Sequence, residues 1–591
     1  MRGTVSGGGQ AGPNTMSDLW EIVSHLLRRI LRHRGGTFLT VLSVLAVGVS
    51  ACSSVQPTTR ASSAQPQPGT SRPLVAQTHA PSSATVVLTG SSPDEMAASL
   101  ARQLFSSAPV VVVSTDDPVA VKAAAVDARR VNAPLLLTAP APSAAGPASG
   151  PPSPTPSASS LAAPGSPRPS PGFPPSARLG PPPTGPRPAD RLLPPSPIDP
   201  ALRSEITGLH PRDVLAVGLP ARVLSARLPG VHVVSVPGAL PATALPRPVG
   251  HVAVLVPPGV SSGTVAMAET AQIAGATVIP VPGDDPRADP TVIAALSAAK
   301  PARVVAAGAG FGPPAVLASR VAVAATGVQL PGGGQILFPG RRLVALYGHP
   351  ESPVLGALGQ QDLPASIARA RRMAAPYQAL SKVPVIPAFE IIATVALGFP
   401  GVDGTYSGVS SVASLRPWVD RAAAAGFYVV LDLQPGRASL LDQARMYEPL
   451  LAMPNVGLAL DAEWKLQPHQ QPLQQIGSVS IGEVNSVVRW LAGLTAERHL
   501  PQKLLVLHQF RLSMIQNEQD LDTRHDDLAI VVHMDGQGTQ GNKQDTWNAV
   551  TGAAPRGVFF GWKNFFTKDQ PMLSPQGTMT RAPAPVMISY Q

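Results

Sequence analysis

Alternating apolar and polar segments divide residues 341–591 into repeated units. Each unit has a short apolar run, a charged or imidazole side chain at its end, and a segment with apolar residues at helical spacing. Such runs, alternating with helices, are typical of parallel strands buried on both faces. Eight runs follow one another: LVALYGH, PVIPAFE, FYVVLDL, VGLALDAEW, KLLVLHQF, LAIVVHMD, GVFFGWK and PVMISY. The pattern predicts a TIM-like (β/α)8 barrel over residues 341–591.

Helices are expected between most of these strands. Their apolar residues recur at helical spacing in four segments: LPASIARARRMAAPYQAL, SVASLRPWVDRAAAAG, SLLDQARMYEPLLAMP and IGEVNSVVRWLAGLTAERH. The segment after the seventh run is short, and no helix follows the eighth run. This ending departs from the regular barrel pattern.

The same alternation occurs earlier, in residues 84–138 and 198–330. The strands ATVVLTG, APVVVVST and APLLLTA enclose two helical segments, which predicts a βαβαβ unit with right-handed crossovers in one parallel sheet. Ser92 or Asp94 can cap the first helix. A second round runs from HVAVLVPP to PARVVAAGAG. We expect an α/β region with a doubly wound (Rossmann- or flavodoxin-like) parallel sheet here.

Proline is unevenly distributed along the chain, which has 69 prolines in 591 residues. Residues 139–197 consist almost entirely of Pro, Ala, Ser and Gly, which predicts a disordered insertion or stiff spacer on the surface. Residues 53–83 are rich in Ser, Pro, Gln and Thr and read as a flexible tether.

The segment that precedes this tether, residues 1–52, reads as a signal peptide. A basic stretch, HLLRRILRHRGG, leads into the apolar run TFLTVLSVLAVGVSAC, which ends in Val49-Ser50-Ala51-Cys52. This ending resembles the lipobox of bacterial lipoproteins. The resemblance implies that Cys52 carries the lipid, palmitate included, and that the rest lies in the cell envelope, on the outer face of the cytoplasmic membrane. An ordinary signal peptide or a simple N-terminal anchor is the alternative, and the start at Met1 or Met16 stays open.

The α/β region carries a second resemblance. The stretch VVVVSTDDPVAVKAAAVDARRVNAPLLLT, followed by DVLAVGLPARV, resembles the cell wall-binding repeat 2 family: Asp116 and Asp117 occupy the turn after the first strand, and residues 133–138 match a later strand. The resemblance covers about residues 84–325 and implies adhesion to cell-envelope polysaccharide or peptidoglycan. The alternative is a generic doubly wound scaffold.

The net charge of +10 raises the question of nucleic acid. Many basic residues lie in the N-terminal segment or the proline tract, and no basic stripe has interleaved aromatic residues, so we expect no nucleic-acid partner. The glycine-rich pieces GAGFGPP and LPGGGQ do not form a dinucleotide or phosphate loop. The one cysteine excludes an intrachain disulfide.

Polar side chains at the ends of the barrel strands are the candidates for a site. A carboxylate buried without a partner costs several kcal/mol, and the carboxyl ends of barrel strands open onto one face, so convergence in one cleft is expected. For any one of them, the alternative is that it caps a helix or pairs with Arg or Lys. The predicted catalytic residues are Glu390, Asp432, Asp461, Glu463, His508, His533, Asp535 and Lys563.

The spacing of these groups suggests what they do. Asp461 and Glu463 are two apart and would share a strand face, as would His533 and Asp535. Carboxylates and imidazoles suit a divalent metal, which stays possible, or a general acid and base. Lys563 could form a Schiff base, contact phosphate or neutralise the acidic cluster. Predicted substrate-binding residues are Trp464, Trp562 and His349, with Phe510 as a further aromatic platform.

Two functions remain open from sequence. The fold and the acid placement resemble glycoside-hydrolase barrels in outline, which implies a glycan hydrolase with Asp461 or Glu463 as acid/base. The chain departs from that pattern, with Asp-Ala-Glu where Asn-Glu is typical on strand four and Lys563 where a Glu would end strand seven. The alternative is a wall-binding lipoprotein with a degenerate barrel. No catalytic Cys and no His-Glu-x-x-His motif supports other hydrolytic chemistry.

Overall fold

The computed structural model describes residues 72–138 and 200–591. By the density of internal contacts, the chain divides into residues 1–70 and 71–591, and the described residues all belong to the second unit. The lipobox with Cys52, most of the tether and the Pro-rich insertion lie outside the described residues. None of the helices within the described ranges combines the length and hydrophobicity needed to cross a bilayer.

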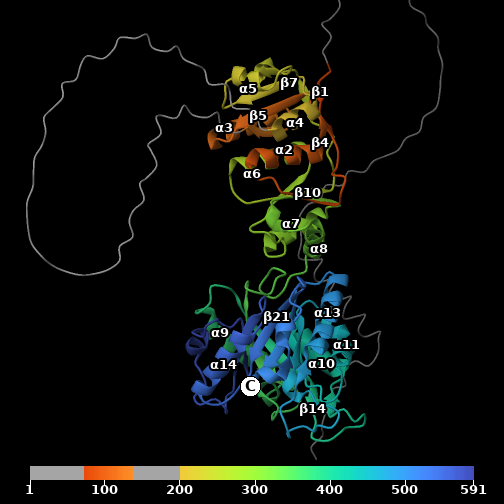
Figure 1. Cartoon of the computed structure of the whole chain (residues 1–591), viewed down its shortest axis with the longest axis vertical. Coiled ribbons are helices and arrows are strands. Elements are labelled where there is room, and N and C mark those ends of the chain that lie inside the picture. Colours follow the sequence, from red (N-terminus) through yellow and green to blue (C-terminus); the bar gives the residue numbers. More distant parts are fainter. Residues whose placement is uncertain (1–71, 139–199) are drawn as a thin grey trace, which may run out of the picture. The chain divides into compact units, whose positions relative to one another are not determined.

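Eight parallel strands close into a barrel, as the sequence predicts. Each strand pairs with the next in chain order, and the last pairs with the first. The strands are β13 (Arg342–Gly348), β14 (Val385–Ala396), β16 (Tyr428–Leu433), β17 (Val456–Asp461), β19 (Lys503–Gln509), β21 (Leu528–Met534), β22 (Phe559–Asn564) and β23 (Met587–Tyr590). Figure 1 shows helices around these strands. A short strand, β15 (Ser407–Val409), extends β14 antiparallel.

The barrel helices begin where the sequence supplies caps. Ser411, Ser480 and Thr539 accept backbone N–H bonds at the starts of α10, α13 and α14. The barrel helices are α9 (Leu363–Gln378), α10 (Val412–Ala424), α11 (Leu440–Met446), α12 (Glu448–Leu451), α13 (Ile481–Glu497), α14 (Gln540–Ala553) and α15 (Pro575–Met579). The last crossover holds only the five-residue α15, and pairing of β23 with β13 closes the barrel without a helix after it.

Alternation along the strands separates two apolar environments. On β16, Val429 and Leu431 belong to the core between strands and helices, whereas Tyr428 and Val430 belong to the core inside the barrel. Successive side chains of a strand point to opposite faces, so Asp432 shares the inward face with Tyr428 and Val430. The same two-residue alternation applies to every barrel strand and determines which side chains point into the interior.

The α/β region forms two four-stranded parallel sheets rather than the expected single unit. One sheet has the order β6-β5-β7-β8 and the other β11-β10-β12-β3. These strands are β3 (Thr85–Leu88), β5 (Val110–Thr115), β6 (Leu135–Thr138), β7 (Asp213–Val217), β8 (His232–Val234), β10 (Val252–Val256), β11 (Thr277–Pro280) and β12 (Arg303–Ala307). The prediction that ATVVLTG, APVVVVST and APLLLTA share one parallel sheet is wrong, because β3 pairs with β12 in the other sheet.

The reason lies in what local sequence specifies. The apolar runs determine which segments become strands, but β3, β5 and β12 are similar Val-rich runs, so composition does not select the partner. The helices here are α2 (Pro93–Leu104), α3 (Pro118–Arg130), α4 (Pro200–Leu209), α5 (Ala221–Arg227), α6 (Ser262–Ile273), α7 (Pro290–Ala299) and α8 (Pro314–Ala325). Ser92, rather than Asp94, accepts the capping bond of α2, from Glu95 N.

Short elements complete the described chain. Three two-stranded pairs form: β1 (Leu74–Val75) with β9 (Thr243–Ala244), β2 (Gln77–Thr78) with β4 (Phe105–Ser107), and β18 (Val479–Ser480) with β20 (Ile515–Gln516). The 3-10 turns are η1 (Pro237–Ala239), η2 (Ala309–Phe311), η3 (Ala357–Gln360), η4 (Ala462–Trp464), η5 (Leu512–Met514) and η6 (Glu518–Asp520).

Candidate functional site

A layer of polar side chains caps the apolar interior of the barrel. Below it, the inward positions are apolar, as in Ala345, Ala388, Val430, Val506 and Val531. Two residues further along each strand, the inward position is polar on all eight strands. We call these residues the polar layer: Tyr347, Glu390, Asp432, Asp461, His508, His533, Lys563 and Ser589. The expected convergence of strand ends is therefore present.

His508 lies between two carboxylates in this layer. Its Nε2 is 3.0 Å from Glu390 Oε1, and its Nδ1 is 3.1 Å from Asp535 Oδ2. Burial opposes the charge of Glu390, but the attraction of His508 outweighs it and lowers the pKa of Glu390 to about 2. Burial likewise opposes the charged imidazole, yet Glu390 and Asp535 hold the pKa of His508 well above its usual value. The three groups therefore form an anion–cation–anion chain.

Tyr347 and Asp432 form a second polar contact. The phenol donates to Asp432 Oδ2 at 2.8 Å, and Gln434 Nε2 donates to the phenol oxygen at 3.4 Å. Burial raises the pKa of Asp432 to about 6, with the charge of Glu390 adding to this and that of His508 opposing it. Burial, followed by the charge of Asp432, raises the pKa of Tyr347. Tyr347 thus stays a hydrogen-bond donor.

His533 is buried in the barrel interior and contacts Ser589. Its Nε2 lies 2.8 Å from Ser589 Oγ, and the ring is fully buried. Burial lowers the pKa of His533 to about 3, so the imidazole is neutral at physiological pH. A side chain at Gly561, on the neighbouring strand, would overlap with His533 Nδ1. His533 therefore packs inside the barrel, and it does not line the pocket described next.

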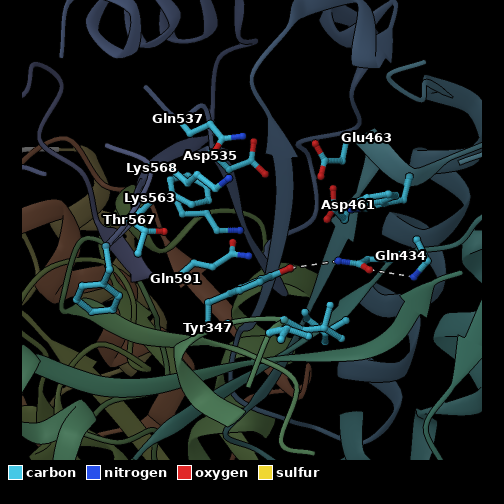
Figure 2. Close-up of a pocket in the computed structure, with 18 of the residues that line it drawn as sticks. Tyr347, Gln434, Asp461, Glu463, Asp535, Gln537, Lys563, Thr567, Lys568 and Gln591 are labelled. Carbon is cyan, nitrogen blue, oxygen red and sulfur yellow. Dashed lines mark hydrogen bonds between the residues drawn. The ribbon is translucent and has the colours of Figure 1, made fainter. Parts of the chain in front are cut away.

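A pocket of about 430 Å³ opens above the polar layer. From the layer itself, Tyr347, Asp461 and Lys563 reach it. Just past the strand ends, Gln434, Glu463 and Asp535 join them, and Figure 2 shows Asp461 and Glu463 on one side with Asp535 and Lys563 on the other. Four aromatic side chains also line the pocket: Trp464, Phe510, Phe565 and Phe566.

The pKa values of the two acids on one side are both raised. Burial, then the charge of Asp432, raises the pKa of Asp461 well above its usual value. Burial, then the charge of Asp535, raises the pKa of Glu463 to about 7. Strand β17 ends at Asp461, and Glu463 lies on the 3-10 turn η4. The expectation that both share one strand face is wrong in this detail, although both line the same pocket.

Asp535, on the opposite side, is held ionised. Burial opposes its charge, but the opposing contributions, led by the hydrogen bond and the charge of His508, together outweigh burial and lower the pKa of Asp535. Strand β21 ends at Met534, so Asp535 lies just past the strand. The expectation that His533 and Asp535 share a strand face is therefore wrong in this detail. Its Oδ1 has no hydrogen-bond partner among the described residues. That oxygen is available to a bound molecule.

Pairing with Arg or Lys does not explain these carboxylates. Among the described residues, Glu390, Asp432, Asp461 and Asp535 have no Arg or Lys nitrogen within 4.0 Å, and the ion pairs that three of them form are with His508. Lys563 instead lies over an aromatic ring: its Nζ is 3.6 Å from the centroid of the Tyr347 ring. Lys563 therefore acts on the acids through space rather than by a direct ion pair.

The predicted substrate-binding residues have three different positions. Trp464 is half-buried and lines the pocket. His349 is near the strand end, where its Nε2 lies 3.1 Å from Ser410 Oγ, but it is outside the pocket lining. Trp562 is fully buried against Trp547 and donates to Asn564 Oδ1 at 2.9 Å. The assignment of Trp562 to substrate binding is corrected, because it points outward between Gly561 and Lys563.

Several lining residues were missed from sequence: Tyr347, Gln434, Lys568, Phe565 and Phe566. A period-two count from Leu343 through Ala345 identifies Tyr347, whereas the polar end of the run LVALYGH pointed to His349. The others lie on loops, where no periodicity identifies the direction of a side chain.

No set of three or more His, Cys, Asp or Glu side chains within the described ranges is arranged to hold a metal ion. The divalent metal that the sequence left open therefore has no candidate ligand set in this part of the chain. Comparisons with protein-family models, with curated proteins and with solved structures find no match. The chemistry of the pocket consequently has to be argued from its own residues.

Proposed function

We propose that the barrel is a hydrolase that cleaves glycosidic bonds in a cell-envelope glycan. The observation that carries the proposal is the placement of Glu463 and Asp535 on opposite sides of one pocket, with pKa values displaced in opposite directions. Two carboxyl groups that flank a substrate in different protonation states are the usual requirement for glycoside hydrolysis. The aromatic side chains of Trp464 and Phe510 beside them suit sugar rings.

The roles follow from these protonation states. Glu463, protonated up to about neutral pH, donates a proton to the oxygen of the leaving sugar as the glycosidic bond breaks. Asp535, ionised, takes a proton from the water that attacks the anomeric carbon. Asp461, which lines the pocket beside Glu463, hydrogen-bonds the substrate. Glu390 and His508 act as positioning residues that keep Asp535 charged and oriented.

The remaining parts of the account depend on sequence alone. We propose that Cys52 carries a lipid that anchors the chain at the outer face of the cytoplasmic membrane. We further propose that residues 84–138 and 198–330, as a doubly wound region, bind the wall polymer on which the barrel acts. The resemblances to a lipobox and to cell wall-binding repeat 2 support these two steps.

The second candidate is a binding protein with a degenerate barrel. The observation in its favour is Lys563, which stands at the end of the seventh strand, where the retaining glycosidase pattern has a carboxylate. A degenerate barrel would still use Trp464 and the pocket to hold a sugar. It would have no need of a protonated Glu463 opposite an ionised Asp535, and for this reason the hydrolase is preferred.

Binding and turnover can be separated on one substrate. Wild-type protein and Glu463→Gln are incubated with purified cell wall, and both the sedimented protein and the soluble sugar fragments are measured, the latter by mass spectrometry. If the protein is a hydrolase, wild type and Glu463→Gln should sediment with the wall to the same extent. Only the wild type should release soluble sugar fragments. Sedimentation of both proteins without fragments from either would favour the binding protein.

A further inference from the structure

The side of the pocket opposite Asp461 and Glu463 carries two ammonium groups. Lys563 and Lys568 both line the cavity, and Figure 2 shows them on the same side as Thr567 and Gln591. The two lysines come from different positions, because Lys563 lies on β22 inside the barrel and Lys568 is an exposed residue on the loop that follows. The pocket therefore has an acidic side and a basic side.

Lys563 is the unusual member of this pair. Its side chain is 3% exposed, yet its Nζ makes no hydrogen bond and has no carboxylate oxygen within 4.0 Å among the described residues. Its Nζ lies over the faces of two aromatic rings, 3.6 Å from the centroid of Tyr347 and 5.4 Å from that of Phe565. Because Lys563 lines the pocket, its ammonium group can reach a molecule bound there, and an anionic group of that molecule would supply the counter-charge that the described residues do not place within 4.0 Å.

Other buried lysines of the barrel show what a structural lysine looks like here. Lys543 forms an ion pair with Asp569 at 2.7 Å and also donates to Lys563 O at 2.7 Å. Lys465 pairs with Glu483 at 2.8 Å. Lys563 alone among these three reaches the pocket, and it alone lacks such a partner. The charge of Lys563 lowers the pKa values of Glu390 and Asp535 from longer range, without a direct ion pair to either.

We propose that Lys563 and Lys568 form a subsite for an anionic group of the substrate, a carboxylate or a phosphate. The subsite lies across the pocket from Asp461 and Glu463, so the substrate is an acidic glycan whose charged group binds the lysines while its glycosidic oxygen faces Glu463. Asp535 is on the same side and offsets part of this positive charge, but its own charge is shared with His508. A neutral sugar could accept hydrogen bonds from Lys563 but would give it no counter-charge.

This inference rests on the proposed function for the orientation of the substrate, but the subsite can be tested without turnover. Binding of glucuronate, glucose 6-phosphate and glucose to the Glu463→Gln protein is measured by calorimetry. We expect at least one of the two anionic sugars to bind about tenfold or more tightly than glucose. Preference for glucuronate identifies a carboxylate subsite, and preference for glucose 6-phosphate a phosphate subsite. Equal binding of all three sugars would overturn the proposal.

Substitutions of lysine link this preference to the subsite. Lys563→Met and Lys568→Met should each remove most of the preference for the anionic sugar, whereas Lys382→Met, at an exposed position between α9 and β14, should leave it unchanged. Because Lys568 is exposed, Lys568→Met should fold, so its sugar preference can be measured even if Lys563→Met fails to fold. An unchanged preference in Lys568→Met and in a folded Lys563→Met contradicts the subsite. Glycan cleavage with no anion preference would overturn the subsite alone, and anion preference without cleavage would overturn the hydrolase alone.

Discussion

His508 Nε2 lies 3.0 Å from Glu390 Oε1, with both side chains fully buried inside the barrel. An ion pair in that position has lost its hydration, so it is stable only while both partners are charged and hydrogen-bonded. The other imidazole nitrogen contacts Asp535, which lines the pocket. The charge state of a pocket residue is thus coupled to a group that the substrate does not reach.

Removing one partner of the His508–Glu390 ion pair should lower the free energy of unfolding. Glu390→Gln leaves the imidazole without its strongest counter-charge, and the expected loss in free energy of unfolding is about 3–5 kcal/mol. Glu497→Gln, at an exposed position near the end of α13, should change it by less than about 0.5 kcal/mol. Urea unfolding at pH 6 measures both. A loss below about 1 kcal/mol for Glu390→Gln would mean that the pair is not charged.

The pH dependence of this stabilisation has a defined sign. The pKa of Glu390 falls from 4.5 to about 2 on folding, so its contribution is complete above about pH 4.5 and is lost toward pH 2. The pKa of His508 is raised above 6.5, so its contribution is complete below 6.5 and is lost only as the pH rises through the folded value. The difference between wild type and Glu390→Gln should therefore be largest at pH 4.5–6.5. A difference that grows below pH 4 would contradict this assignment.

The titration of Glu463 should respond to the charges around it. Asp535 raises its pKa and Lys563 lowers it. NMR titration of the glutamate carboxyl carbons should therefore give a lower value for Glu463 in Asp535→Asn and a higher value in Lys563→Met than in the wild type, where it is about 7. In the active enzyme, kcat/KM should fall roughly tenfold for each pH unit well above this value. Activity that rises steadily from pH 7 to pH 9 would be inconsistent with Glu463 as the acid.

The close approach of two strands at Gly561 gives a packing prediction. A Cβ there would overlap with His533 Nδ1, so Gly561→Ala should destabilise the barrel by about 1–3 kcal/mol. Gly493→Ala, within α13 and with no heavy atom near its added Cβ, should instead be neutral or stabilise by up to about 1 kcal/mol. Thermal unfolding of the two variants tests this contrast. Equal effects would show that the interior at His533 is loosely packed.

The barrel could be predicted from sequence because its signals are local. Eight apolar runs of strand length, separated by helical segments, leave few alternatives to a closed parallel sheet, and charges at the ends of those runs identify most of the polar layer. The outward direction of Trp562 also follows from strand alternation, because Lys563 faces inward and adjacent side chains of a strand point to opposite faces.

Other features depend on the folded chain. The pairing of β3 with β12 could not be derived, because similar Val-rich strands compete for the same edge and sequence adjacency favours the wrong one. The protonation of Glu463 depends on burial and on the charge of Asp535, which is distant in sequence. The unpaired state of Lys563 likewise appears only when its surroundings are known.

The most direct measurement is the rate at which reducing ends are released from purified wall glycan near pH 6. The wild type should release them, Glu463→Gln should be at least about 100-fold slower, and Glu497→Gln should match the wild type. A folded Glu463→Gln protein that retains the full wild-type rate, or a wild type that releases no reducing ends from any acidic or neutral wall glycan, would contradict the assignment of the pocket as a hydrolytic site.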